Sequence, residues 1–262
     1  MPITLDEKLG KWLSAPDPSS NHNEACAKRQ ATTGDWFIQS SNFAKWKEDR
    51  NSLLWLHGIP GCGKTILCST VIENVLLESR PAVNKAVAYF YFDFRNTECQ
   101  HEGMLRSLIN QLAVRCTNQS NPLKSLYSSC GDGARQPKLY ELKQTLQNLV
   151  QGFDDTFVIL DALDEFKKRE DLLDNIQQII KWQPGGLRIL VTSRREWDIR
   201  QTLDPLLNEN QSIDIQSEVV DRDIRVYVRE ILQTAKGLSR WRNKPEVQDE
   251  IEKALTENAN GM

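Results

Sequence analysis

A run of glycines followed by lysine and threonine is the clearest chemical signal in this sequence. Residues 58–65 read Gly-Ile-Pro-Gly-Cys-Gly-Lys-Thr, which fits the pattern GxxxxGK[ST] at every fixed position. Glycines let the backbone turn successive N–H groups toward one anion, and a following helix adds its N-terminal N–H groups and positive dipole end. The segment predicts a phosphate-binding loop, with the candidate contacts Gly58, Pro60, Gly61, Cys62, Gly63, Lys64, Thr65 and Ile66.

Two side chains of this loop have distinct expected roles. Lys64 would reach the β- and γ-phosphates of a nucleotide, and the Thr65 hydroxyl would ligate Mg²⁺. The pattern arises by chance in on the order of one chain in a hundred of this length. A strand before the loop and a helix after it, described below, make chance a weaker explanation.

A second signal is a group of carboxylates that follows an apolar run. Residues 157–160 are apolar, and Asp161, Asp164 and Glu165 come after them. A carboxylate at the carboxyl end of a buried parallel strand lies where ligands bind, so Asp161 would hold Mg²⁺ directly or through water. Glu165, or less favourably Asp164, could orient the attacking water and remove its proton. The alternative is a solvated acidic turn before a helix N-terminus.

Hydroxyl and guanidinium groups follow another apolar stretch. Residues 189–191 are apolar, and Thr192, Ser193, Arg194 and Arg195 come next. Arg194 is placed to sense or stabilise charge on the γ-phosphate. The alternative is that one or both arginines cap a turn at the surface.

The elements that must position these groups alternate along the chain. Apolar runs of strand length indicate strands buried on both faces, and apolar residues at helical spacing separate them. The sequence predicts strands at 52–57, 86–94, 156–160, 187–192 and 212–215, and helices at 66–77, 104–116, 139–150 and 172–180. This alternation favours an α/β fold whose parallel sheet is covered by helices on both faces.

The two ends of the chain differ from this alternating centre. Residues 1–50 form a lead-in that we expect to be polar and irregular to residue 35, after a short amphipathic start, with a short helix in 36–50. Residues 51–218 form the expected core. From Val219 the apolar pattern is wholly helical, so 219–262 is expected to be the incomplete start of a small helical appendage.

Composition excludes several classes of protein. Lys and Arg total 33 against 36 for Asp and Glu, and a pI of about 5.8 indicates no surface for nucleic acid or an anionic membrane. No apolar run approaches the ~18 residues of a transmembrane helix, and no secretory signal begins the chain. We expect a cytoplasmic protein with reduced cysteines. The three histidines and six cysteines show no metal-ligand spacing.

The motifs as a set resemble the NACHT domains of the STAND class of P-loop NTPases, in particular the nephrocystin-like NACHT domains of fungal NOD-like receptor proteins. The resemblance covers nearly the whole chain. It is carried by Trp12-Leu13-Ser14 with Asp17-Pro18, Thr33-Gly34-Asp35-Trp36-Phe37, residues 55–65, Tyr91-Phe92-Asp93-Phe94, residues 160–165, Val191-Thr192-Ser193-Arg194 and residues 247–251.

The resemblance implies a three-layer P-loop NTPase that binds ATP or GTP with Mg²⁺ and acts as an oligomerising switch, closed with a diphosphate and open with a triphosphate. It implies phosphate and Mg²⁺ contacts for Lys64 and Thr65, a Walker B pair of Asp161 and Glu165, and a sensor role for Arg194.

The same resemblance bears on the lead-in, because this segment often shields the nucleotide base in the family. Thr33, Gly34 and Trp36 become candidates for the base pocket, and the alternative is that Trp36 packs against the sheet. Family members usually continue into a winged-helix module and a repeat array. This sequence ends in or just after the first helices of the appendage, and the expected partners are nucleotide and copies of itself or of related NACHT proteins.

Three functions compete at this point. The first is a slow Mg²⁺-dependent NTPase switch that uses Lys64, Thr65, Asp161 and Glu165. The second is a module that binds nucleotide without useful turnover. The third is a P-loop kinase of small molecules, which should carry an arginine-rich lid. Only Arg194, Arg195 and Arg200 stand where such a lid would lie.

Overall fold

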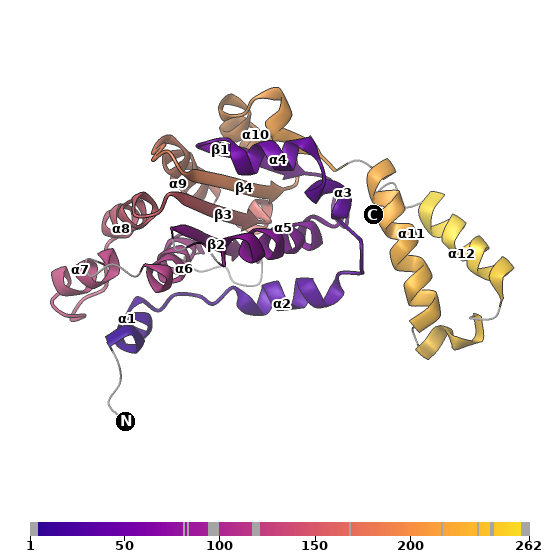
Figure 1. The fold of residues 1–262 in the computed structure, drawn as a ribbon, viewed down its shortest axis with the longest axis horizontal. Coiled ribbons are helices and arrows are strands. Elements are labelled where there is room, and N and C mark those ends of the chain that lie inside the picture. Colours follow the sequence, from indigo (N-terminus) through magenta and orange to yellow (C-terminus); the bar gives the residue numbers. More distant parts are fainter. Residues whose placement is uncertain are drawn as a thin grey trace.

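Five parallel strands form the centre of the chain. The structure is a computed structural model that describes residues 5–80, 82, 84–93, 100–116, 121–167, 169–215, 217–234, 236–241 and 244–257. The strands are β1 (Ser52–His57), β2 (Lys85–Tyr91), β3 (Asp155–Asp161), β4 (Leu187–Ser193) and β5 (Ser212–Asp214). Their order across the sheet is β2-β3-β4-β1-β5, so β4 separates the first strand from the third (Figure 1).

Side chains of these strands alternate between two apolar layers, as the pleat of a strand requires. In β1, Leu53 and Trp55 enter one buried cluster, and Leu54 and Leu56 enter the other. All six residues of β1 are buried, which is typical of a strand with helices on both of its faces. The sheet is therefore the middle layer of an α/β/α sandwich, as the alternating sequence pattern predicts.

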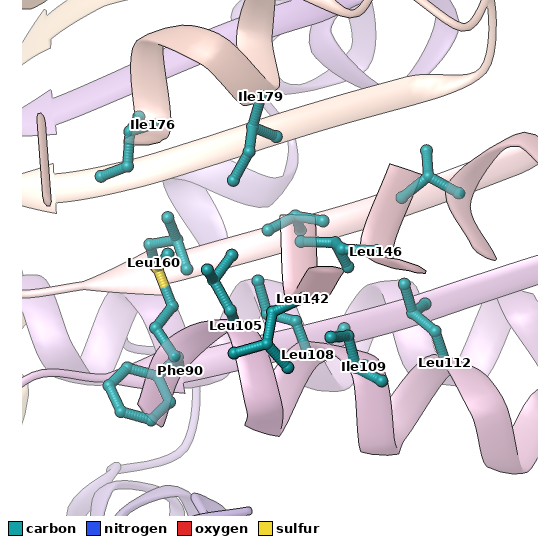
Figure 2. Close-up of a cluster of buried hydrophobic side chains, with 14 of the residues drawn as sticks. Phe90, Leu105, Leu108, Ile109, Leu112, Leu142, Leu146, Leu160, Ile176 and Ile179 are labelled. Carbon is teal, nitrogen blue, oxygen red and sulfur yellow. The ribbon is translucent and has the colours of Figure 1, made fainter. Parts of the chain in front are cut away.

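Helices cover both faces. One face packs against α1 (Leu5–Leu13), α6 (Gln100–Arg115), α7 (Pro122–Ser129), α8 (Leu139–Gln151), α9 (Arg169–Lys181) and α10 (Trp197–Leu203). Figure 2 shows how leucines and isoleucines of α6, α8 and α9 interdigitate with strand residues such as Phe90 and Leu160. The other face packs against α3 (Asp35–Ile38), α4 (Ser41–Glu48) and α5 (Lys64–Ser79).

The lead-in contains a helix that the sequence analysis missed. We expected residues up to 35 to be irregular after the first helix, but α2 (Ser19–Lys28) forms there and packs along α5. The buried face of α2 consists of His22 and Ala25 rather than large apolar residues. The pattern of hydrophobic residues is therefore too weak to predict this helix.

The carboxyl-terminal part is helical, as predicted from residue 219 onward. Here α11 (Ser217–Thr234) and α12 (Pro245–Glu257) pack against each other as a hairpin beside the sheet, joined through a short 3₁₀ segment (Lys236–Trp241) (Figure 1). Among the described residues, no helix combines the length and the apolar content needed to cross a bilayer.

A side chain covers one position on the outer edge of the sheet at β2. The amide of Gln111, on α6, accepts from the Tyr89 backbone N–H at 3.1 Å and donates to the Tyr89 carbonyl at 2.8 Å. Gln111 therefore satisfies both main-chain groups of Tyr89 as a neighbouring strand would.

Candidate functional site

The sheet topology brings the two sequence motifs to one edge. His57 at the end of β1 pairs with Ser193 of β4, and Leu160 near the end of β3 pairs with Val191 of β4. The carboxyl ends of these three strands are therefore level, with β4 in the middle. Ligands bind at this edge in open parallel sheets.

The loop after β1 has the backbone that its glycines predict. Gly61 and Gly63 have φ angles of +80° and +84°, in the left-handed region where a side chain causes strain. A Cβ added to Gly58 would lie 2.7 Å from the Cys62 sulfur, so the loop closes tightly at its start. Gly63 is the N-cap of α5, and no described side chain caps that end. The free N–H groups of the first turn are left for a ligand.

The Lys64 ammonium lies over the loop. Nζ donates to the carbonyl oxygens of Gly58 at 2.9 Å and Ile59 at 2.8 Å, and the Cys62 sulfur lies 3.6 Å away. The positive charge is therefore held beside the same backbone that curls around the phosphate position. Cys62 itself is buried, whereas Pro60 and Gly61 are exposed at the rim of the loop.

Asp161 joins the two motifs. Its carboxylate accepts hydrogen bonds from the Thr65 hydroxyl at 2.7 Å and from the Thr192 hydroxyl at 2.6 Å. The Thr192 oxygen also accepts from the backbone N–H of Ala162 at 2.9 Å. Ala162 has a φ of +60°, an unfavourable angle for a residue with a side chain, so these contacts fix a strained turn directly after the carboxylate.

The charge of Asp161 is costly to maintain where it lies. Burial raises the pKa of the Asp161 carboxyl above its ordinary value, against the lowering effect of the Thr192 and Thr65 hydroxyls and of the Lys64 ammonium. The Cys68 thiol is fully buried beside this carboxylate, and burial raises its pKa well above the ordinary value. Asp161 is thus a buried carboxylate whose charged form is favoured by an ammonium group of the loop at residues 58–65.

The other two acidic residues lie in different surroundings. Asp164 has a nearly buried side chain and accepts from the Arg194 backbone N–H at 2.9 Å and from Arg194 Nε at 2.6 Å. This hydrogen bond raises the pKa of Arg194. Glu165 instead lines a cavity of about 350 Å³ together with Thr65 and Asp161. The geometry therefore separates the pair: Asp164 holds Arg194, and Glu165 faces the space beside the Thr65–Asp161 contact.

A larger cavity of about 580 Å³ opens on the other side of the loop. Its wall includes apolar side chains and the residues that the sequence analysis associates with a base. The lining comprises Lys28, Gln30, Thr33, Gly34, Trp36, Gly61, Cys62, Gly63, Ile66, Leu67, Ile215, Asp223, Ile224, Tyr227, Val228 and Leu255. Ile66 and Lys28 border both cavities.

Helix α11 is tied to the lead-in across this cavity. The Asp223 carboxylate accepts from the Gly34 backbone N–H at 2.8 Å and from the Trp36 indole N–H at 3.2 Å. The apolar part of Trp36 also packs at the border of the core. Trp36 therefore does both things that the sequence analysis weighed: it packs against the core and it lines the cavity.

The candidate residues from the sequence line these two cavities or belong to the loop of residues 58–65, except Asp164 and Arg194, which pair with each other. Two contributors were missed. Thr192 bonds Asp161, and Asp223 bonds the lead-in. The hydroxyl at the end of β4 was a visible signal for Thr192. The sequence indicates Asp223 only as a polar position of an amphipathic helix. Phe94, the last residue of one predicted strand, lies outside the described residues.

The chain is similar in sequence to known proteins. A sequence profile of the family described as Nephrocystin 3, N-terminal, matches residues 32–194, more than half of the chain. The Vegetative incompatibility protein HET-E-1 of Podospora anserina is 23% identical over 248 residues, covering 86% of this chain and 18% of that protein. The chain thus spans less than a fifth of the length of that relative.

A solved structure was also matched. A chain from the Structure of Drosophila ORC bound to DNA aligns with 91% of this chain and 58% of its own length, at a TM-score of 0.45 and 12% identity. A likeness of this strength adds nothing to the fold already seen in the sheet. The profile match, in contrast, covers both the phosphate loop and the acidic strand end. The chain therefore belongs to the nephrocystin 3 N-terminal family, a NACHT-like group of P-loop NTPase domains, as its motifs indicated.

Proposed function

We propose that this chain is a nucleotide switch that binds ATP or GTP with Mg²⁺ at the loop of residues 58–65 and hydrolyses it slowly. The observation that carries the proposal is the 2.7 Å contact between the Thr65 hydroxyl, at the start of α5, and the Asp161 carboxylate, at the end of β3. Two motifs far apart in the sequence meet there as a pair of hard oxygen ligands beside a basic loop.

The residues fit both groups that the family implies. Lys64 and the free N–H groups at the start of α5 would bind the phosphates, since they form a positive, concave surface. Thr65 and Asp161 would hold Mg²⁺, which prefers oxygen ligands and offsets the negative charge of the phosphates. The raised pKa of Asp161 supports this assignment, because a buried carboxylate gains most from a nearby cation.

The hydrolytic step needs a base, and the geometry favours Glu165 over Asp164. Asp164 is engaged twice by Arg194, so its lone pairs already serve to position the guanidinium. Glu165 lines the cavity beside Thr65 and Asp161, where it can orient a water molecule and accept its proton. Arg194, held by Asp164, would stabilise negative charge at the γ-phosphate.

The base and ribose would occupy the larger cavity. Trp36, Ile215 and Tyr227 supply the apolar wall that a planar base requires, and Gly34 lines the cavity beside Trp36. Within the proposal, residues 1–50 shield the base, 51–218 form the NTPase core and the helices from 219 cover the cavity.

A signalling role is part of the same proposal. The name of the fungal relative links that protein to vegetative incompatibility, and this chain spans 18% of it. We infer that the chain acts as the nucleotide-controlled part of such a system and associates with copies of itself or with related NACHT proteins.

The proposal is tested with two variants. Lys64→Ala should bind fluorescent ADP or GDP about 30- to 150-fold more weakly, because a charged hydrogen-bond donor worth about 2–3 kcal/mol is lost. Glu165→Gln should bind nucleotide like the parent and hydrolyse it at least about 100-fold more slowly. The matched controls are Lys45→Ala, on the exposed face of α4, and Glu170→Gln, at the exposed start of α9.

Two results would count against it. Equal nucleotide affinity in Lys64→Ala and Lys45→Ala would mean that nucleotide does not bind at the loop of residues 58–65. Equal hydrolysis in Glu165→Gln and Glu170→Gln would remove Glu165 as the base. Tight binding with no turnover in the parent chain would leave the second function, a module that binds nucleotide without hydrolysing it.

A further inference from the structure

A histidine, a cysteine and a glutamate meet at the contact between α2 and α5, away from the Thr65–Asp161 pair. His22 and Cys26 lie one turn apart on the same face of α2, and Glu73 faces them from α5. One ligand atom of each residue lies within 4.8 Å of the others. Sequence spacing alone does not indicate this cluster, because its third residue comes from a different helix.

The separations already approach those of a bound zinc ion. With Zn–N of about 2.05 Å and Zn–S of about 2.3 Å, tetrahedral geometry places the two ligand atoms about 3.6 Å apart. The distance from His22 Nε2 to the Cys26 sulfur is 3.6 Å. The distance from Nε2 to Glu73 Oε1 is 2.9 Å, so this oxygen would move outward by about 0.5 Å to reach a tetrahedral position.

The histidine is held in the orientation that a ligand needs. His22 is 5% exposed, and its Nδ1 lies 3.0 Å from the Tyr91 hydroxyl. With the Nδ1 proton donated to that hydroxyl oxygen, Nε2 keeps its lone pair directed at Cys26 and Glu73. A second hydrogen bond of this kind is the usual support of a metal-ligating histidine. The Tyr89 ring, 5.0 Å from the imidazole centroid, packs beside it.

The charges and access also suit a divalent ion. A thiolate, a carboxylate and a neutral imidazole carry two negative charges in total, which one Zn²⁺ ion balances. Binding would replace the proton of the Cys26 thiol by the metal and release that proton to solvent. The Glu73 side chain is 44% exposed, so the ion can arrive from solvent and a water molecule can complete its coordination.

We propose that His22, Cys26 and Glu73 form a three-ligand site for Zn²⁺ that fastens α2 to α5. The consequence concerns the wall of the smaller cavity, because Asn21, Glu24 and Ala25 of α2 line it together with Thr65. A bound ion fixes this wall independently of nucleotide.

The test is a zinc titration of the metal-free chain against a chromogenic chelator, with excess Mg²⁺ present to occupy sites made only of oxygen. The parent should bind one equivalent of Zn²⁺. Cys26→Ser and Glu73→Gln should bind it more than about tenfold more weakly. The control is Cys116→Ser, which changes another partly exposed cysteine, directly after α6. Its affinity for Zn²⁺ should equal that of the parent.

Cobalt substitution identifies the ligand directly. Co²⁺ bound to the parent and to Cys116→Ser should show a thiolate charge-transfer band that is missing in Cys26→Ser. Circular dichroism of the metal-free variants establishes that they fold. The proposal is overturned if the parent binds no stoichiometric zinc, in which case the three side chains form a hydrogen-bonded network only, or if Cys26→Ser keeps either the parent affinity or the band.

Discussion

Asp161 carries a charge in a place where water cannot stabilise it. The carboxylate is 2% exposed and depends on two threonine hydroxyls for its hydrogen bonds. Burial raises its pKa, so the folded chain holds the carboxyl proton more tightly than the unfolded chain does. Ionisation of Asp161 therefore costs folding free energy as the pH rises through the folded-state pKa, and the cost vanishes below the ordinary value of 3.8.

Because the pKa of Asp161 is raised, replacing this carboxylate should stabilise the nucleotide-free chain. At pH 7.5 the free energy of unfolding of Asp161→Asn, measured in urea, should be higher than that of the parent, because the neutral amide avoids the cost of a buried charge. The gain should shrink as the pH falls toward 4. Urea denaturation at several pH values measures it, and a gain that did not vary with pH would contradict this explanation.

Asp164→Asn is the matched comparison. Its carboxylate is nearly buried but pairs with Arg194, so its removal should lower the free energy of unfolding by about 1 kcal/mol. If both variants changed stability in the same direction, the distinction between the two carboxylates would be wrong.

Only some residues of the candidate site could be predicted from the sequence. The positions of Lys64, Thr65 and Asp161 at one edge of the sheet could be predicted, because each residue follows a run of apolar residues or the loop after it. The contact of Thr192 with Asp161 depends on β4 lying between β1 and β3, which the linear order does not state. His22, Cys26 and Glu73 meet only after two helices pack.

Among the elements, the buried strands were the most predictable. The apolar run of β1 has the predicted bounds, Ser52–His57, and the other four strands differ from their predictions by a few residues at their ends. Continuous apolar runs leave few alternatives for a sheet buried on both faces. Helix α2 was missed because it buries an imidazole and a methyl group, which hydrophobic periodicity does not register.

The Asp223 carboxylate attaches α11 to the lead-in, and its removal should loosen the helix. Asp223→Ala removes the carboxylate that accepts from Gly34 and Trp36. The backbone amide of Gly34 is buried, so its loss of an acceptor should weaken the attachment by about 1–3 kcal/mol. Amide hydrogen exchange in α11 and at Gly34 should become faster, whereas exchange in β1 and β3 should not change.

Asp249→Ala is the control for this prediction, since Asp249 is exposed on α12. Unchanged exchange in Asp223→Ala, or equal acceleration in both variants, would mean that packing rather than the carboxylate holds the helix.

For the whole molecule, ligand binding and folding are linked. If the proposed nucleotide site forms only in the folded chain, Mg²⁺ with ADP or GDP at about 100 times its dissociation constant should add about 2.7 kcal/mol to the free energy of unfolding. For a chain of this size the melting temperature should rise by about 5–11 °C. Scanning calorimetry at one equal concentration of each nucleotide would identify the preferred base, because the nucleotide that binds more tightly gives the larger rise.

Lys64→Ala provides the control, because its melting temperature should respond little to the same additions. A rise of equal size in that variant would place the binding elsewhere on the chain.

The side chain of Gln111 has a consequence for how copies of this chain could assemble. An incoming strand at the β2 border would first have to displace the amide that already occupies both main-chain groups of Tyr89. Growth of a continuous sheet from one molecule to the next is thereby disfavoured at that position. If copies of this chain associate, contacts through helical surfaces are therefore more favourable than strand pairing at Tyr89 of β2.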